Sequence, residues 1–424
     1  MHVTILPLLA GLLLTGLPIF AALGLCVFFL LWWFTGVPLT IVPQRYFGGI
    51  DSFTLMAIPF FILAAEFMRA GGMAERLVSF SRVLVGWLPG GLAMAGVLAC
   101  AFFGAISGSS PATLAAIGSI VIPVLIKSGY SVPFSVGLIT TAGSLGIVIP
   151  PSITFVIYGA VTGTSIGRLF AAGLLPALMV VSMLIVYCYI KARREGFEWS
   201  SPPPLREIAM AARKAAWGLG LPVIILGGIY SGVFTPTESA AVAAVYGFVV
   251  GAFIYRQLDV PATMAALRTA GLLSATLLLI TASASAFSWL LASQGIPGML
   301  SREIIGWSDE PWVILLLFNV ILLIAGCFLD GASALIILAP LMVDVVQQIG
   351  IDPVQFGVIA AMNVEIGMMT PPVGLNLFVA VSITGMGILQ VARAVIPTVL
   401  IMTVGLMLVS YIPWISMALP NYLY

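Results

Sequence analysis

The 424-residue chain has very little charge: Asp, Glu, Lys and Arg together make up 7 %, whereas hydrophobic residues make up 61 %. Soluble domains carry about 25 % charged residues, so this chain cannot cover the surface of a water-soluble protein. Its apolar segments are long enough for helices that cross a bilayer, which need about 20 residues each. The composition therefore excludes a soluble protein and predicts an all-α polytopic membrane protein.

The sequence lacks the residues that several kinds of functional site require. The single histidine, His2, leaves nothing for a histidine metal site or a Ser-His triad. No glycine-rich phosphate loop is present, and a net charge of +1 gives no footprint for nucleic acid. The cysteines show no Cys-x-x-Cys spacing and are interpreted as packing residues: Cys26, Cys100, Cys188 and Cys327. We expect no nucleotide, no transition metal and no nucleic-acid partner, so any transport must use an ion gradient or a partner protein.

The apolar segments divide the chain into five parts. Residues 1–52 hold an N-terminal scaffold helix, predicted as one retained helix over 6–33, and an interfacial segment. A first repeat covers 53–168, and central scaffold helices with a cytoplasmic loop at 191–214 cover 169–255. A second, inverted repeat covers 256–394, and a C-terminal helix follows in 395–424. The expected single spans are 53–68, 133–160, 169–190, 218–233, 237–255, 270–293, 354–386 and 395–418.

Two apolar segments, 91–127 and 312–348, are too long for one crossing and too short for two. Each has a polar, small-residue interruption at its middle, at 107–113 and 329–333. Loops at membrane depth occur only where they line a cavity or are buried in protein. We therefore predict two re-entrant helical hairpins whose tips lie near the middle of the membrane.

Each hairpin is followed by a second interruption with a Pro-Pro pair, at 143–152 and 367–376. Because proline lacks a backbone N–H and restricts the residue before it, each pair predicts a discontinuous helix. The distance from hairpin tip to Pro-Pro pair is 42 residues in the first copy (150 − 108) and 40 in the second (371 − 331). Hairpin and broken helix thus occur twice at similar spacing, which indicates an internal repeat.

Basic residues predict the orientation of the chain. Six of them lie within 191–214, which places this loop in the cytoplasm. Counting crossings from it gives nine full spans and two hairpins that enter from opposite faces, with the N-terminus in the cytoplasm and the C-terminus in the periplasm. The two repeats are therefore inverted. Amphipathic arms at 74–87 and 300–307 precede the hairpins and are expected to lie on the membrane surfaces.

Inverted repeats with broken helices are typical of secondary transporters, whose site lies at the midplane between the repeats. A broken helix exposes N–H groups that attract a carboxylate, and C=O groups that with hydroxyls can surround a hard cation such as Na⁺. The candidates for substrate binding are Ser107, Ser109, Ser110, Thr113, Ser152, Thr370 and Asn376. The candidates for Na⁺ are Ser107, Gly108, Gly143, Ser144, Gly146, Val148, Asp330, Gly331, Ser333, Gly367 and Thr370.

Carboxylates at membrane depth are costly and point either to function or to a structural ion pair. Asp330 lies at a hairpin tip, and Glu365 lies two residues before a break. Glu66 and Glu238 lie near predicted helix ends and are interpreted as structural. No arginine or lysine falls within either tip or either break. An acidic substrate must therefore be held by backbone amides, hydroxyls and the charge of a bound cation.

Four separated motifs resemble the large membrane subunit (DctM-like) of tripartite ATP-independent periplasmic (TRAP) transporters. They read FGAISGSSPAT at 103–113, GIVIPPS at 146–152, GVFTPTESA at 232–240 and MTPPVGLN at 369–376, and AIPFF at 57–61 and the Gly71-Gly72 pair agree with them. The resemblance spans essentially the whole chain. It implies an elevator-type transporter of the ion-transporter superfamily kind in the bacterial inner membrane, with Na⁺ as the coupling ion for the import of organic acids.

The same resemblance implies two partners. One is a soluble periplasmic substrate-binding protein, and the other is a small four-helix membrane subunit that we expect as a separate chain. The tip at 107–113 is similar to the C4-dicarboxylate branch, so the expected substrate is a C4-dicarboxylate or a related carboxylate or sulfonate.

Other classes remain to be distinguished. A stand-alone cation-coupled carboxylate carrier of the ion-transporter superfamily would need no binding protein. A passive channel would need a fixed pore, which inverted broken helices suit poorly. An intramembrane enzyme would need a catalytic dyad, and although Asp330 and Glu365 are two carboxylates, no Gly-x-Gly-Asp motif accompanies them. We therefore expect a transporter and not an enzyme.

Overall fold

The computed structural model describes residues 2–308 and 310–424, and within these ranges the chain forms helices and no β-strand. Nine helical segments of this described part are long and apolar enough to cross a bilayer, and one bent pair adds a tenth. Some of these segments are limbs of the hairpins, so they are not the same set as the nine full crossings expected from the sequence. The chain is a multi-pass, all-α membrane protein.

The prediction of a single N-terminal helix over 6–33 is wrong. The chain forms α1 (His2–Leu14) and α2 (Ile19–Phe34), which pack against each other. The first helix ends because Gly16 adopts a φ of +80° and Pro18 has no N–H to continue the ladder. Neither helix is as long as an ordinary membrane span, so the count that placed the N-terminus in the cytoplasm loses its first crossing. A short helix, α3 (Ile41–Ile50), then lies against α14 (Val260–Ser293).

The first predicted repeat contains both of the interruptions expected from the sequence. Its hairpin breaks at residues 108–109 and its long helix breaks at 149–152, where the two halves are bent by 42°. Its elements are η1 (Phe53–Met56), α4 (Ala57–Ala70), α5 (Met73–Val85), α6 (Gly91–Ser107), α7 (Ser110–Thr113), η2 (Leu114–Gly118), α8 (Ser119–Lys127), α9 (Val132–Val148) and α10 (Ile153–Thr162).

The second repeat gives the same succession of arm, hairpin and broken helix. The hairpin breaks at residues 329–330 and the long helix at 368–374. After α14 its elements are α15 (Ile296–Trp307), α16 (Pro311–Phe328), α17 (Gly331–Gln348), α18 (Pro353–Gly367) and α19 (Leu375–Thr384).

The central and C-terminal helices differ from the prediction at their ends. The central ones are α11 (Ile166–Arg194), α12 (Leu205–Tyr230), α13 (Pro236–Val249) and η3 (Val250–Ile254). Because α11 and α12 extend into the polar stretch at 191–214, only residues 195–204 form a linker. The expected C-terminal helix is divided into α20 (Ile388–Tyr411) and α21 (Pro413–Leu423).

Glycine contacts join each hairpin to its broken helix. A Cβ on Gly104 of α6 would lie 2.8 Å from the Cα of Gly146 in α9. In the second repeat, a Cβ on Gly326 of α16 would lie 3.1 Å from the Cα of Gly367 in α18. Small residues allow membrane helices to approach this closely. The matching contacts support the internal repeat.

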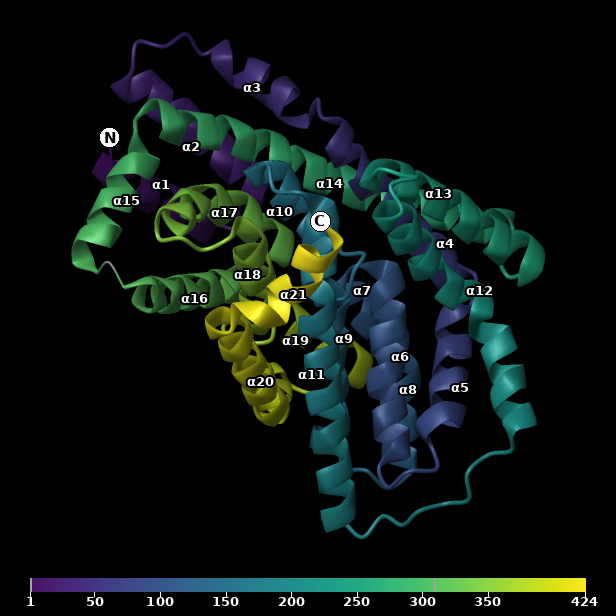
Figure 1. Ribbon diagram of the computed structural model, residues 1–424. Coiled ribbons are helices and arrows are strands. Elements are labelled where there is room, and N and C mark those ends of the chain that lie inside the picture. The colour runs from purple at the N-terminus through teal and green to yellow at the C-terminus, as the bar shows by residue number, and fades with distance from the viewer. Residues whose placement is uncertain (1, 309) are drawn as a thin grey trace.

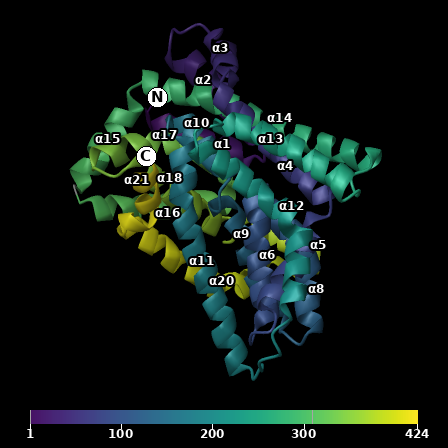
Figure 2. The same ribbon diagram turned by 45° about the vertical axis from the view of Figure 1, so that its right-hand side comes forward.

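The linker between α11 and α12 lies at the same end of the molecule as the α5–α6 and α8–α9 connections (Figures 1 and 2). The Phe197 ring stacks on Tyr130 at 4.6 Å between centroids, and the N–H of Ser200 donates to the Trp87 carbonyl at 3.0 Å. These contacts bring together the last turns of α5, α8 and α11, which carry the basic residues Arg82, Lys127, Lys191, Arg193 and Arg194.

Candidate functional site

The tip of the first hairpin is the two-residue break between α6 and α7. Gly108 adopts a φ of +59°, and a Cβ there would lie 2.9 Å from the Pro151 carbonyl oxygen, so the position requires glycine. The Gly108 carbonyl accepts a hydrogen bond from the Ile153 N–H at 3.3 Å. The hydroxyl oxygens of Ser107 and Thr113 lie 2.7 Å apart. The tip is thus hydroxyl-lined and held in place by the break that follows it.

The tip of the second hairpin is built around Asp330. Its carboxylate accepts from the N–H groups of Ala332 and Ser333, both at 3.1 Å, and the Ser333 hydroxyl also donates to it. Asp330 therefore caps the free N–H groups of α17. The N–H of Gly374, at the start of α19, donates to the Cys327 carbonyl at 3.1 Å. Among the described residues Asp330 has no lysine or arginine partner, so the structural ion pair considered from the sequence is absent there.

The two tips line one cavity of about 280 Å³. The first repeat contributes Ser107, Gly108 and Ser109, and the second contributes Asp330 and Gly331. The remaining walls come mainly from α4, α10, α14 and the second break, and include Glu66, Thr154, Leu273, Leu277, Ile280 and Met368. The structure therefore brings together tips that are more than 200 residues apart, against an apolar wall from α14.

Glu66 is one of the polar residues of this cavity that the sequence prediction missed, together with Thr154 and Thr276. Its side chain is 9 % exposed, and its Oε2 lies 2.6 Å from Nη2 of Arg69, whose side chain is 46 % exposed. The ion pair agrees with the structural role predicted for Glu66. The position near the end of α4 gave no sign that the carboxylate would also face the hairpin tips.

Three of the residues predicted to bind Na⁺ face neighbouring helices and not the hairpin tips. The Ser144 hydroxyl points to α20, 3.1 Å from the Met402 sulfur. Gly143 packs against η2 around Leu114, and the Val148 carbonyl faces α11. These positions lie on the sides of α9 that pack against other helices. Hydroxyls and glycines in membrane helices often serve such close packing.

The remaining candidates at the two breaks, Gly146, Ser152 and Thr370, contact residues of the nearby tip or of their own helix. Gly146 lies against the Ser109 carbonyl, because a Cβ there would be 2.8 Å from that oxygen. Ser152 caps α10, and Thr370 donates its hydroxyl back to the carbonyl of Ile366 at 2.8 Å. Gly146, Ser152 and Thr370 therefore shape the tips and breaks and are not among the residues that line the cavity.

A buried carboxylate joins the two repeats beside the cavity. Glu365 of α18 has no exposed surface and accepts from the hydroxyl of Ser110 and the amide of Asn376, both at 2.6 Å. Glu365 Oε2 and Asn376 Oδ1 have no hydrogen-bond partner among the described residues. Ser110 and Asn376 were predicted to bind substrate, and the structure instead places them in this buried link between hairpin and broken helix.

The oxygen atoms around the tips fit a small hard cation better than a transition metal. At the end of α9, Pro150 and Pro151 supply no N–H to the carbonyls of Gly146 and Ile147. At the end of α18, the carbonyls of Ile366 and Gly367 accept from the N–H groups of Met369 and Thr370. Carbonyls, hydroxyls and one carboxylate are the ligands that such cations prefer. No group of three His, Cys, Asp or Glu residues that could hold a metal occurs in residues 2–308 and 310–424.

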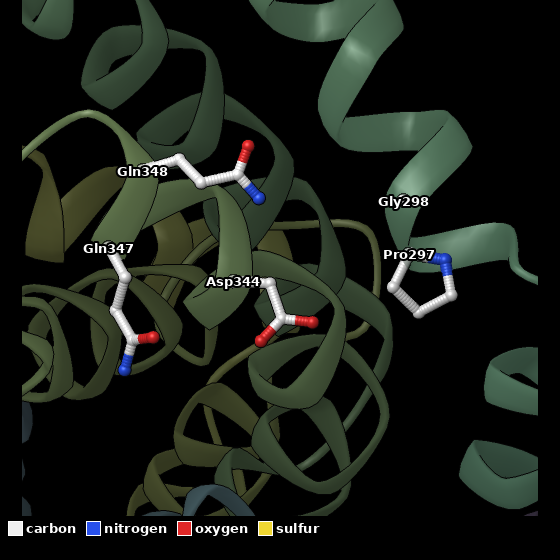
Figure 3. A pocket seen from close by; sticks show the side chains of 5 residues that line it. All are labelled: Pro297, Gly298, Asp344, Gln347 and Gln348. Carbon is white, nitrogen blue, oxygen red and sulfur yellow. The ribbon is translucent and has the colours of Figure 1, made fainter.

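A second polar hollow lies at the other end of α17, where that helix meets α15 (Figure 3). Asp344, Gln347 and Gln348 of α17 line it together with Pro297 and Gly298 of α15. Asp344 is 14 residues along α17 from Asp330, or roughly 21 Å at 1.5 Å per residue. This hollow is therefore separate from the cavity at the tips.

Comparison with known proteins agrees with this architecture. The family model "Tripartite ATP-independent periplasmic transporter, DctM component" matches residues 6–415. The C4-dicarboxylate TRAP transporter large permease protein DctM of Rhodobacter capsulatus is 45 % identical, with 98 % of each chain covered. The isethionate TRAP transporter permease protein DctMQ of Oleidesulfovibrio alaskensis is 40 % identical over 97 % of this chain and 66 % of its own.

A solved structure shows the same fold. The YdaH transporter of Alcanivorax borkumensis superposes with a TM-score of 0.63 over 90 % of this chain and 88 % of its own, at 17 % identity. That identity supports the architecture alone. The whole-length match to the family model and the relatives that cover nearly all of both sequences show that this chain belongs to the DctM component family of tripartite ATP-independent periplasmic transporters.

Proposed function

We propose that the chain is the Na⁺-coupled membrane subunit of an importer for small organic acids. The single observation that carries this proposal is the cavity in which hairpin tips from both repeats meet. Such a site, reached from opposite faces by inverted elements, is suited to alternating access.

Electrostatics supports the need for a coupling cation. Among the described residues that line the cavity, Glu66 and Asp330 are acidic and none is a lysine or an arginine. Arg69 neutralises Glu66, whereas Asp330 caps a helix and has no ionic partner within the described part of the chain. An incoming acid would meet the negative charge of Asp330, which a Na⁺ ion at the tips would offset. Cation and acid would therefore bind together.

For the substrate we propose a C4-dicarboxylate. Relatives that are 44–47 % identical are named for C4-dicarboxylate, and the relative at 40 % identity is named for isethionate. A related carboxylate or a sulfonate is the alternative substrate. We further propose a periplasmic substrate-binding protein and a small four-helix membrane subunit as partners, because the matched family is the DctM component of a tripartite system.

We propose that the complex lies in the bacterial inner membrane with the 195–204 linker in the cytoplasm and the C-terminus in the periplasm. The hairpins and broken helices would move as one body against α4, α11–α14 and the arms. The glycine contacts within each repeat and the Glu365 link between repeats support a rigid moving body.

Uptake into proteoliposomes tests this function. The chain is reconstituted with its small subunit, and uptake of radiolabelled succinate is measured with and without a Na⁺ gradient and with and without the binding protein. We expect uptake only when both are present. Uptake that is unchanged when K⁺ replaces Na⁺ and the pH gradient is collapsed would refute the coupling. Uptake that does not need the binding protein would favour a stand-alone carboxylate carrier.

A further inference from the structure

A basic groove lies between the arm helix α5 and the start of α12, away from the hairpin tips. It has a volume of about 850 Å³ and is closed on its third side by the connection that follows η3. Its charged residues are Arg76, Arg213, Lys214 and Glu75. Three cations against one carboxylate favour an anionic occupant. None of the three cations forms an ion pair within the part of the chain that the structure describes.

The groove is held in shape by contacts among its own residues. The Arg76 guanidinium lies over the ring of Tyr255 at 3.8 Å and donates to the carbonyl of Gly72. The Tyr255 hydroxyl donates to the carbonyl of Lys214 at 2.9 Å, which ties the α13–α14 connection to α12. Arg76 is therefore held in place and half-buried, whereas Arg213 and Lys214 are exposed.

Apolar side chains continue from the groove along α12. Met210 and Trp217 line it and are 50 % and 47 % exposed. Further along the same helix, Val223 is 71 % exposed. Trp217 thus lies between basic residues and an apolar surface, which is the usual place of tryptophan at a membrane interface. The helix α12 begins directly after the 195–204 linker, and its first half carries Arg213 and Lys214.

We propose that this groove binds the headgroup of an anionic phospholipid. Basic pockets between membrane helices on the cytoplasmic side recognise such headgroups, and each nearby lysine or arginine strengthens the attraction. The phosphate would pair with Arg76, Arg213 and Lys214, and the acyl chains would lie along Trp217 and Val223. Because α5 leads into the first hairpin, the lipid would bridge the arm and the scaffold helix α12.

Native mass spectrometry of the full chain tests the proposal, with phosphatidylglycerol as the probe lipid. The test variant carries Arg213→Gln and Lys214→Gln. The matched control carries Arg193→Gln and Arg194→Gln, which remove the same charge outside the groove. We expect the unmodified chain and the control to retain phosphatidylglycerol, and the test variant to bind it at least about tenfold more weakly. An exchanged pair, Arg213→Lys with Lys214→Arg, should bind normally and shows that the effect depends on charge.

Three results would overturn the proposal. Equal loss of lipid from the control variant would mean that only the general surface potential attracts it. Competition by inorganic phosphate alone at equal concentration would mean a free-anion site. Displacement of the lipid by the co-expressed small subunit, with loss of that subunit in the test variant, would mean that the groove is a protein contact.

Discussion

Two carboxylates beside the hairpin tips illustrate how differently acidic residues are used in this membrane protein. Asp330 faces the cavity and caps α17, while Glu365 is fully buried and joins the two repeats. A buried charge is costly unless it is paired or hydrogen-bonded. The two residues therefore call for different experiments.

Changing Asp330 to asparagine should reduce Na⁺-dependent uptake at least about tenfold while the fold is kept. Asparagine still offers an oxygen to the N–H groups of Ala332 and Ser333 but lacks the negative charge that a cation needs. The measurement is uptake into proteoliposomes as a function of Na⁺ concentration, at equal amounts of reconstituted protein.

Glu238→Gln provides the control for this experiment. As predicted, Glu238 belongs to a capping box, where its Oε2 accepts from the Thr235 N–H at 2.8 Å. Glutamine serves equally well at that position. Uptake by this variant should be close to normal, and equal defects in the two variants would contradict the role given to Asp330.

Removing the Glu365 side chain should destabilise the protein more than neutralising it. Glu365→Ala leaves the Ser110 hydroxyl and the Asn376 amide without their buried acceptor, at about 1–3 kcal/mol for each unsatisfied group. Glu365→Gln keeps an oxygen for both donors. Thermal unfolding in detergent should show a clearly lower midpoint for the alanine variant. If both variants unfold at the same temperature, the link is not what holds the repeats together.

At the level of the elements, the contact between hairpin and broken helix depends on small residues. Gly146→Ala would place a Cβ 2.7 Å from Thr113 Oγ1 and 2.8 Å from the Ser109 carbonyl. Overpacking of this kind costs about 1–3 kcal/mol. We expect a lower unfolding midpoint and weaker uptake, because the first tip must shift.

The control for this substitution is Gly271→Ala in α14. A Cβ there has nothing within 4 Å, and alanine is the better helix former. The variant should be as stable as the unmodified chain or slightly more stable. A loss of stability equal to that of Gly146→Ala would mean that close packing is not the cause.

The elements that sequence reasoning located best are those marked by backbone chemistry. Glycine and paired prolines determine where helices break, so both hairpin tips and both Pro-Pro breaks were placed correctly. The turn between α1 and α2 was not predicted, because the prediction rested on long runs of apolar residues. Within such a run, Gly16 and Pro18 were not recognised as residues that end a helix. The Ser110–Glu365 bond, which spans 255 residues, could not be predicted, since side-chain partners depend on how the repeats pack.

For the whole molecule, the arrangement of the two repeats around one cavity predicts a moving body and a fixed frame. The hairpin tips are joined to the breaks by the backbone bonds at Gly108 and Cys327, and the first hairpin is joined to the second broken helix through Glu365. The opposite wall of the cavity belongs to α14, which packs along α2, α3 and α4. If one part slides against the other, a site divided in this way becomes accessible from the opposite side of the membrane.

Spin labels in a cysteine-free background distinguish this motion from a stationary site. The native cysteines are free and buried, and their replacement by alanine or serine prepares the background. One labelled pair, Ser109→Cys with Ala332→Cys, reports the distance between the two tips. The other, Ala112→Cys with Thr276→Cys, reports the distance from the first hairpin to α14, and all four positions line the cavity.

Between Na⁺-loaded and Na⁺-free states we expect the tip-to-tip distance to stay constant. The hairpin-to-α14 distance should change by more than about 5 Å, the height of one helical turn. The physical reason is that hydrogen bonds and glycine contacts join the tips to the breaks, whereas mainly apolar side chains form the wall on α14. A constant distance in the second pair through a working cycle would contradict the elevator mechanism. The two tips would then have to open in turn around a stationary site, and the first pair would change instead.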